Sequence, residues 1–210
     1  MKVILVGAIT LCGRISPTGH GSLLDRRRLE ELRDKTHASL MGANTLRLEN
    51  PEMRGTDGTL PSDRVRSIIS QSGSVPLEGK KLFTHGPRPF VFTSEENVFA
   101  LQGRLNDKAH VISLPKGADG LSLEAASDHL AGKGVESLLI EGGAKLNYSA
   151  LAQGIVDEIM LTVIPFISGD HNSPAFADGP ESLGEPFLEF ELLACETVST
   201  GELFLHYRKK

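Results

Sequence analysis

Short apolar runs alternate along the chain with longer stretches in which apolar residues recur at helical spacing. The short runs predict β-strands, and they lie at residues 3–8, 38–41, 65–70, 90–93, 110–114, 137–140 and 158–164. The longer stretches predict helices, at residues 23–35, 97–105, 123–131 and 144–152. Because strands and helices alternate, we expect an α/β fold with a mixed, mostly parallel central sheet flanked by helices.

The pattern changes after Pro165. Residues 187–199 and 201–210 contain alternating apolar and polar positions, and Thr200 and Gly201 between them are typical of a hairpin turn. We therefore expect the sheet to end in antiparallel C-terminal strands.

Two segments, 50–63 and 168–186, are rich in Gly, Pro and Asp and are predicted loops. Loops of this length in a compact domain are often functional. No internal repeat or interdomain linker interrupts the pattern. Residues 1–210 are therefore predicted to form a single domain.

Composition and charge narrow the function classes. The net charge of −5 and the pI of about 5.8 argue against a general role on nucleic acids or membrane surfaces. No apolar run is long enough to span a bilayer. The two cysteines, Cys12 and Cys195, lie far apart and outside any metal-binding spacing, so we expect no metal site and a reducing, cytoplasmic location.

The run at 137–140 is followed by Glu141, Gly142 and Gly143 and then directly by a predicted helix. In open α/β sheets, ligands bind at the carboxyl ends of strands, and a helix N-terminus suits a pyrophosphate. A tight turn without a ligand would also explain the two glycines. It would not explain a carboxylate at the strand end, because acidic side chains are rarely buried without a partner.

A second strand-to-glycine junction occurs at Gly42, with Thr45 in the first turn of the segment that follows. The Thr45 hydroxyl is suited either to capping that segment or to binding phosphate. A third element, residues 10–19, follows the first strand and combines the hydroxyl of Thr10, the thiol of Cys12 and the guanidinium of Arg14. For Arg14 alone, an exposed position without a ligand is the default.

Together these pieces resemble the riboflavin-biosynthesis pyrimidine reductase family, of the type found as the C-terminal domain of bacterial bifunctional deaminase–reductases. The stretches that carry the resemblance are "TLCGR" at 10–14, "RDKTHASLMGANT" at 33–45, "ENP" at 49–51 and, most specifically, "EGGAKLNYSALAQGIVDEIMLTVIP" at 141–165. The resemblance covers nearly the whole chain and implies the dihydrofolate-reductase-like fold. The zinc deaminase signature is absent, so no deaminase domain is expected.

The resemblance implies an NADPH-dependent oxidoreductase acting on 5-amino-6-(5-phosphoribosylamino)uracil. In that reaction the ribosyl group accepts a hydride and becomes a ribityl chain. The cofactor carries the hydride, and the protein mainly positions the reactants. The resemblance also implies a homodimer.

The same resemblance implies roles for individual residues. The residues expected to line the dinucleotide are Gly42, Thr45, Gly142, Gly143 and Ala144. Those expected to face the substrate are Thr10, Arg14, Arg33, Asn50 and Glu141, with Arg14 or Arg33 meeting its phosphate. Glu141 is the candidate catalytic residue, as a group that supplies or orients a proton; a structural hydrogen bond to a backbone amide is the alternative. Weaker candidates are Arg54 for the substrate phosphate and Ser70, Thr93 and Ser94 for the cofactor's 2′-phosphate, with turn capping as the alternative for the last three.

Several positions depart from the family pattern. Cys12 stands where the family has an acid, Arg14 replaces Lys, and His37 and Ser70 replace Asp. A thiol cannot replace a carboxylate as a hydrogen-bond acceptor or ion partner. Two alternatives therefore remain open. One is a sister reductase acting on a pterin, folate-like or secondary-metabolite substrate, and the other is a non-catalytic nucleotide-binding module.

Overall fold

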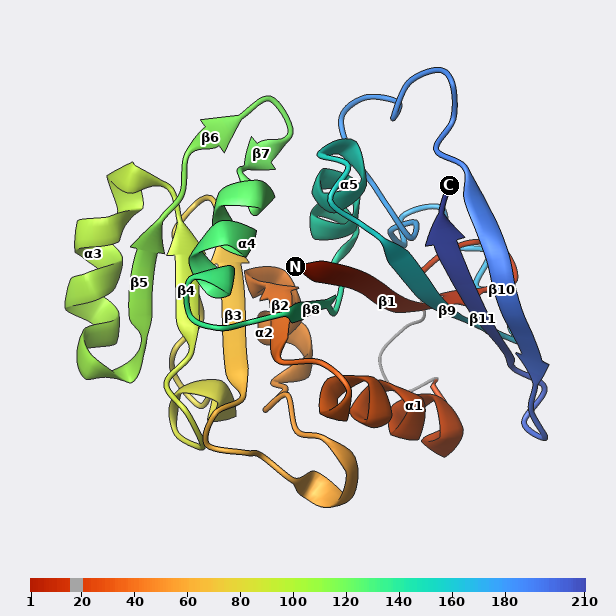
Figure 1. The fold of residues 1–210 in the computed structure, drawn as a ribbon, viewed down its shortest axis with the longest axis horizontal. Helices are drawn as coiled ribbons and strands as arrows, with labels where there is room; N and C mark the ends of the chain where they lie inside the picture. The colour runs from red at the N-terminus through yellow and green to blue at the C-terminus, as the bar shows by residue number, and fades with distance from the viewer. Residues whose placement is uncertain (16–20) are drawn as a thin grey trace.

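A nine-stranded sheet forms the centre of the computed structural model, which describes residues 1–15 and 21–210 (Figure 1). The strands of this sheet are β1 (Lys2–Thr10), β2 (Ala38–Gly42), β3 (Val65–Ser70), β4 (Phe90–Thr93), β5 (His110–Ser113), β8 (Ser137–Ile140), β9 (Glu158–Ile164), β10 (Phe190–Thr197) and β11 (Leu203–Lys209). The α-helices are α1 (Leu23–Asp34), α2 (Ala43–Glu49), α3 (Glu95–Leu105), α4 (Leu123–Ala131) and α5 (Ala144–Ala152). A small hairpin joins β6 (Lys116–Gly117) to β7 (Gly120–Leu121), and short 3-10 turns occur at Thr56–Gly58, Lys81–Phe83 and Asn106–Lys108.

The strand order is β10-β11-β9-β1-β8-β2-β3-β4-β5. Pairing is parallel from β9 through β1 and β8 to β5, whereas β11 runs antiparallel to both β9 and β10. The predicted α/β architecture, with a mostly parallel sheet and antiparallel C-terminal strands, is confirmed. Gly201 has a φ of +84° in the turn between β10 and β11, a conformation that glycine adopts without strain.

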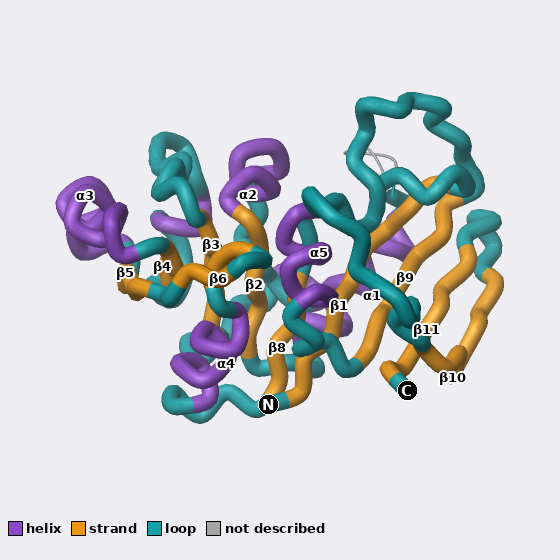
Figure 2. Tube along the Cα trace, turned by 90° about the horizontal axis from the view of Figure 1, so that it is seen from above, coloured by secondary structure: helices purple, strands orange, loops and turns teal. Residues whose placement is uncertain are grey.

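Helices cover both faces of the sheet, as Figure 2 shows for α2 and α3 on one side of the strands and α4 on the other. Alternate residues of each strand point to opposite faces. On β1, for example, Val3 and Leu5 pack toward α4 and α5, whereas Ile4 packs against Leu32 of α1. The site-bearing strand ends are therefore held between two apolar layers.

The helix predicted at 23–35 begins after Ser22, as its sequence indicates. The Ser22 side chain accepts hydrogen bonds from the backbone N–H groups of Leu24 and Asp25, which satisfies two otherwise unpaired donors of the first turn. Within the parts of the chain that the structure describes, no helix is both long enough and apolar enough to cross a bilayer.

Candidate functional site

Glu141 follows β8 directly, and its side chain points toward the last turn of α1. Its carboxylate accepts two hydrogen bonds from Arg33, at 2.9 Å from Nε and 2.7 Å from Nη2. The two side chains are only 5% (Arg33) and 4% (Glu141) exposed. This is the two-pronged geometry in which arginine binds carboxylates most strongly. The structure therefore brings together two residues that the sequence assigns to the substrate, and it pairs them with each other.

A buried polar network surrounds this ion pair. The remaining Arg33 donor, Nη1, reaches the carbonyl of Arg54 at 2.9 Å, and Arg64 donates to the Arg33 carbonyl and to the Ser39 hydroxyl. Burial alone would raise the pKa of Glu141, but the charge and hydrogen bonds of Arg33 outweigh it, so this pKa lies below its usual value. The network holds a fixed negative charge at Glu141, and its geometry favours positioning over proton transfer.

The glycines after Glu141 adopt conformations that other residues avoid. Gly142 and Gly143 have φ values of +87° and +98°. The Gly142 carbonyl accepts hydrogen bonds from the Gly42 N–H at 3.3 Å and from the Thr45 hydroxyl at 3.5 Å. The two strand-to-glycine junctions that the sequence singles out are thus in direct contact, at adjacent carboxyl ends of β2 and β8.

The N-terminus of α5 has features of an anion site. Gly143 provides no side-chain cap, and the first turn of the helix contains no acidic residue. Free backbone N–H groups and the helix dipole at such an end attract phosphate. Ala144, the first residue of α5, is buried, and a Cβ placed on Gly143 would lie 3.2 Å from the Thr45 hydroxyl. A side chain at this point would therefore crowd the junction.

The loop after β1 is fastened to the segment around Ser173. The Thr10 hydroxyl lies 3.2 Å from the Cys12 sulfur and also accepts a hydrogen bond from the Arg14 N–H at 3.2 Å. Arg14 in turn donates through Nη1 to the Ser173 carbonyl at 3.0 Å. Hydrogen bonds lower the pKa of the exposed Cys12 thiol to about 6. The bond with Thr10 contributes most, and the bond with Ser168 contributes next. Residues 16–19 of this predicted element lie outside the described residues.

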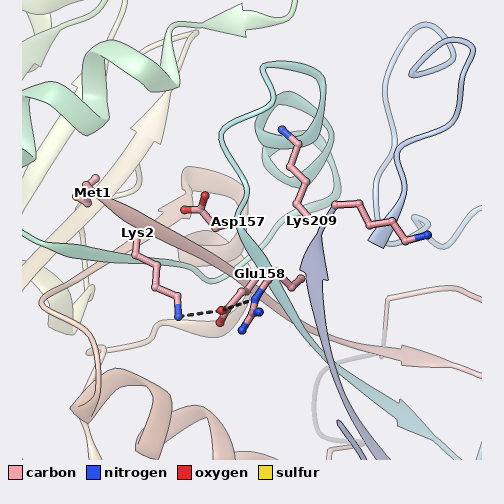
Figure 3. A pocket seen from close by; sticks show the side chains of 7 residues that line it. Met1, Lys2, Asp157, Glu158 and Lys209 are labelled. Carbon is pink, nitrogen blue, oxygen red and sulfur yellow. Dashed lines mark ion pairs between the residues drawn. The ribbon is translucent and has the colours of Figure 1, made fainter. Parts of the chain in front are cut away.

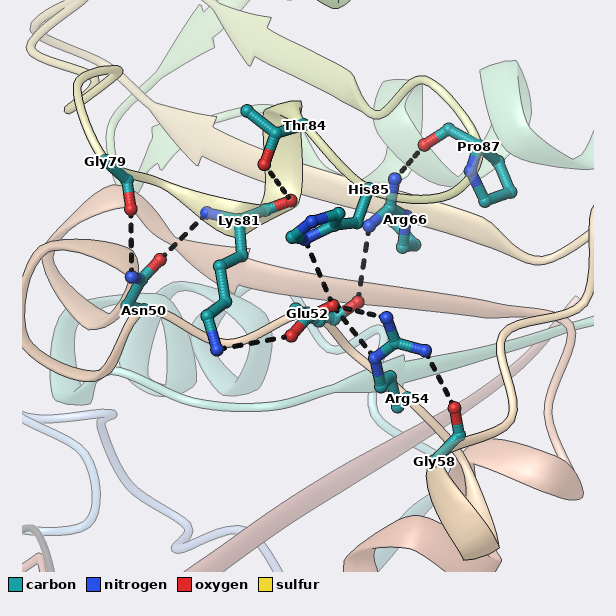
Figure 4. Close-up of polar contacts among 10 residues, drawn as sticks. All are labelled: Asn50, Glu52, Arg54, Gly58, Arg66, Gly79, Lys81, Thr84, His85 and Pro87. Carbon is teal, nitrogen blue, oxygen red and sulfur yellow. Dashed lines mark hydrogen bonds and ion pairs between the residues drawn. The ribbon is translucent and has the colours of Figure 1, made fainter.

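Asn50 stabilises the loop that follows α2 (Figure 4). It has a φ of +50°, its amide donates to the Gly79 carbonyl at 3.0 Å, and its side-chain oxygen accepts from the Lys81 N–H at 3.1 Å. Both polar atoms of Asn50 are thus used inside the protein. The guanidinium of Arg54 pairs with Glu52 at 2.6 Å. These contacts shape the loop, which carries the Arg54 carbonyl to Arg33.

The hydroxyls proposed for a 2′-phosphate are bonded within strand-end turns. Thr93 donates to the Ser70 carbonyl at 2.8 Å, and Ser94 donates to the Gln71 carbonyl at 3.0 Å. Ser70, Thr93 and Ser94 are all buried. This arrangement favours their alternative role in turn structure.

Two buried residues of the site are not predicted from the sequence. Arg64 lies in a polar loop, where an exposed position is the default for arginine. Asn147 lies on α5, and only 1% of its surface is exposed. A polar residue flanked by Leu146 and Tyr148, both buried, is the sequence signal that marks Asn147 as unusual.

A surface cavity of about 540 Å³ lies elsewhere, where β1 begins (Figure 3). Its lining includes Lys2, Glu158 and Arg208, and Glu158 pairs with Lys2 at 2.9 Å and with Arg208 at 3.8 Å. None of the residues predicted to bind substrate or cofactor lines it. It therefore lies apart from the candidate site.

Comparisons with known proteins identify the family of the chain. A family model described as the RibD C-terminal domain matches residues 1–204. The chain is 31% identical over 215 residues to the 2,5-diamino-6-ribosylamino-4(3H)-pyrimidinone 5′-phosphate reductase of Methanothermobacter thermautotrophicus, a match that covers 99% of this chain and 98% of the relative. It is 29% identical over 184 residues to the enzyme of the same name from Aquifex aeolicus, covering 85% of this chain and 80% of the relative.

Among solved structures, a pyrimidine reductase-like protein from Corynebacterium diphtheriae superposes with a TM-score of 0.81 at 24% identity, covering 100% of this chain and 92% of that one. This likeness supports the fold. The relatives found by sequence are named reductases, which confirms the predicted enzyme class, an oxidoreductase of the riboflavin-biosynthesis type. The chain belongs to the RibD C-terminal domain family.

Proposed function

We propose that the protein is an NADPH-dependent reductase that converts the ribosyl group of a phosphoribosylamino-pyrimidine into a ribityl chain. The observation that carries the proposal is the contact between the two strand-end junctions, Gly42–Thr45 and Gly142–Gly143, beside the uncapped N-terminus of α5. This pairing offers a dinucleotide two glycine-lined surfaces and one helix end.

The residues present fit the cofactor. Gly142, Gly143 and Ala144 would hold the pyrophosphate against the start of α5, and Gly42 and Thr45 would border it from β2. Both glycines have left-handed φ values that residues with a Cβ rarely adopt, so no side chain stands between the turn and a bound phosphate. When bound, the reduced nicotinamide supplies the hydride, and the protein supplies position and charge.

On the substrate side, we assign the phosphate to Arg14 rather than to Arg33. The Arg33 guanidinium is committed to Glu141 and to the Arg54 carbonyl, whereas Arg14 lies half-buried in the loop after β1. Thr10 shapes that loop. In this proposal Glu141 and Arg33 position the strand end, and Asn50 positions the loop after α2.

The names of the relatives that match nearly end to end favour one substrate. They act on 2,5-diamino-6-ribosylamino-4(3H)-pyrimidinone 5′-phosphate, which carries an amino group where the aminouracil substrate carries an oxygen. We therefore propose the diamino compound for this chain and keep the aminouracil as the second candidate. One observation favours the alternative, a sister reductase acting on a pterin, folate-like or secondary-metabolite substrate: Cys12 stands where the family has an acid.

The test is NADPH oxidation followed by absorbance, with each of the two pyrimidines supplied in turn and NADH as the comparison cofactor. Cys12→Asp is assayed alongside. Turnover of the diamino compound by the unmodified protein is the expected result. Turnover by Cys12→Asp alone would indicate a re-purposed site, and binding of NADPH without turnover of either pyrimidine would refute the assigned reaction.

We also propose a cytoplasmic homodimer. Both cysteines are free and exposed, as suits a reducing compartment. The edge strand β10 exposes Leu192 (50%), and the loop before it exposes Phe187 (70%), more apolar surface than a solvated sheet edge normally carries. Light scattering on the purified protein is expected to give twice the chain mass, and Leu192→Glu is expected to shift it toward the monomer.

A further inference from the structure

Asn147 has an unusual hydrogen-bonding state. Its side-chain amide donates through Nδ2 to the Phe176 carbonyl at 2.7 Å, which fixes the orientation of the amide. Its other polar atom, Oδ1, is buried and has no hydrogen-bond partner among the described residues. Buried side-chain oxygens nearly always have a partner, so this acceptor calls for an explanation.

The unpaired oxygen lies beside the glycine turn. A Cβ placed on Gly142 would stand 3.9 Å from Asn147 Oδ1 and 3.9 Å from the Val6 carbonyl oxygen. Two acceptors thus flank the same side of Gly142, one from α5 and one from β1.

The sheet opens at this point. β8 pairs with β1 only as far as Leu5 and Ile140, while β1 continues beside β9 to Thr10. Val6 is therefore the first residue of β1 beyond its last β8 pair, and Gly142 follows the end of β8. The neighbouring Gly7 faces the ring of Phe176, whose carbonyl binds Asn147. The same small region thus joins β1, the glycine turn, α5 and the loop containing Phe176.

The chemistry of the two acceptors restricts their partner. A phosphate group brings oxygen acceptors and would be repelled by them, so the pyrophosphate belongs at the N–H groups of α5. The nicotinamide nucleoside has neutral donors in its carboxamide N–H groups and its ribose hydroxyls. We propose that Asn147 Oδ1 accepts a hydrogen bond from the nicotinamide nucleoside half of the cofactor, next to Gly142. This inference rests on the proposed function.

The proposal sets the direction in which the dinucleotide lies. The nicotinamide end lies at the opening between β1 and β8, near the loop that begins at Thr10 and carries Arg14. The adenosine end extends toward β2 and Thr45. Asn147 also links the nicotinamide end to the loop containing Phe176, because its Nδ2 donates to the Phe176 carbonyl and its Oδ1 accepts from the cofactor. We therefore regard Asn147 as a specificity residue for the nicotinamide half of the cofactor.

The test compares dissociation constants, measured by isothermal titration calorimetry, for three probes: NADPH, its 3-acetylpyridine analogue, which lacks the carboxamide N–H donors, and 2′-phospho-ADP-ribose, which lacks the nicotinamide. Asn147→Leu removes the acceptor in a side chain of similar shape. It is expected to weaken NADPH about tenfold, because a buried donor loses its partner. Binding of 2′-phospho-ADP-ribose is expected to stay within about twofold.

The acetylpyridine analogue separates the two donor sources. If the carboxamide is the donor, the analogue binds both proteins equally; if a ribose hydroxyl is the donor, Asn147→Leu weakens the analogue as much as NADPH. Asn147→Ser, whose hydroxyl is too short to reach the same point, serves as a second variant should the leucine variant not fold, and it is expected to show the same selective loss. Ser149→Ala is the matched control on α5, since Ser149 bonds the Asp119 carbonyl at 2.7 Å, away from Gly142.

Equal affinities of the unmodified and substituted proteins for NADPH would overturn the assignment of Asn147. So would an equal loss for NADPH and 2′-phospho-ADP-ribose, since that pattern indicates a general distortion of the site. Failure of the unmodified protein to bind either of these two probes would instead refute the proposed cofactor itself. The two failures are therefore distinguishable.

Discussion

Arg33 and Glu141 join the last turn of α1 to the end of β8 through two charge-assisted hydrogen bonds of 2.9 and 2.7 Å. Taking two charges out of water is costly, and the pair is stable only because each charge meets the other in good geometry. This contact fixes the residue immediately before the glycine turn, so the shape of that turn depends on an ion pair buried beneath it.

Replacement of Glu141 by Gln is expected to destabilise the fold by about 3 kcal/mol, because Arg33 would remain buried without its counter-charge. Urea unfolding measures the change. The control is Glu31→Gln, which removes an exposed pair to Arg27 at 3.1 Å and is expected to cost no more than about 0.5 kcal/mol. A Glu141→Gln protein of normal stability but without turnover would show that Glu141 acts on the substrate instead.

Gly143→Ala is expected to weaken NADPH binding at least about tenfold and to destabilise the fold by about 1–3 kcal/mol, because alanine is strained at a φ of +98°. Fluorescence titration and urea unfolding give the two quantities. Gly103→Ala is the comparison, since Gly103 lies within α3 and a Cβ there would meet nothing within 4 Å. That variant is expected to gain about 0.5–1 kcal/mol and to bind NADPH normally. Normal binding by Gly143→Ala would argue against a cofactor at this turn.

Cys12 is expected to react with iodoacetamide well below the pH at which an ordinary thiol does, because hydrogen bonds from Thr10 and Ser168 lower its pKa to about 6. Peptide mass spectrometry across a pH series reports the extent of alkylation at Cys12, with the labelling of Cys195 in the same sample as an internal reference. Thr10→Val removes the stronger hydrogen bond and is expected to move the Cys12 profile to higher pH. An unmoved profile would show that Thr10 does not stabilise the thiolate.

His129 is expected to make the fold less stable as the pH falls through the mid-range. Burial, aided by the charge of Lys133, lowers the pKa of His129 below 6.5 in the folded protein. The ring packs edge-on against Phe90 and Phe92, at centroid distances of 5.4 and 5.9 Å. The unfolded chain therefore binds a proton first, so stability is full above about pH 6.5 and declines below it until the folded-state pKa is passed.

Urea unfolding between neutral and mildly acidic pH tests this dependence. His129→Gln is expected to flatten the slope, whereas His171→Gln, a change on an exposed loop, serves as the reference substitution. An identical slope in His129→Gln and the unmodified protein would assign the acid sensitivity to other groups.

The sequence predicts most of the elements because their patterns are local. The strands at 65–70, 90–93, 137–140 and 158–164 and the helices at 123–131 and 144–152 have the predicted bounds. The helix predicted at 97–105 begins earlier, at Glu95, because the polar residues of its first turn carry no apolar signal. The helix α2 is not among the predicted helices, because the sequence indicates only a turn after Gly42 and not where that turn would end.

The site is predictable only in part. Gly142 and Gly143 can be identified from the sequence, since consecutive glycines between a strand and a helix have few structural reasons to occur. The pairing of Arg33 with Glu141 depends on which strands become neighbours, and nothing local specifies that β8 lies between β1 and β2. The unpaired oxygen of Asn147 is less visible still, because it depends on a tertiary contact, the bond from the Asn147 amide to the Phe176 carbonyl.

The position of β1 has a consequence for biosynthesis. This strand is synthesised before its two neighbours in the sheet, which begin only at Ser137 and Glu158. The nascent chain must therefore carry β1 without its two neighbouring strands until residues 137–164 have been made. Contacts this distant in sequence slow folding and leave intermediates open to association and to chaperones. The same central placement that lets β1 meet the glycine turn thus delays completion of the sheet until β8 and β9 have been synthesised.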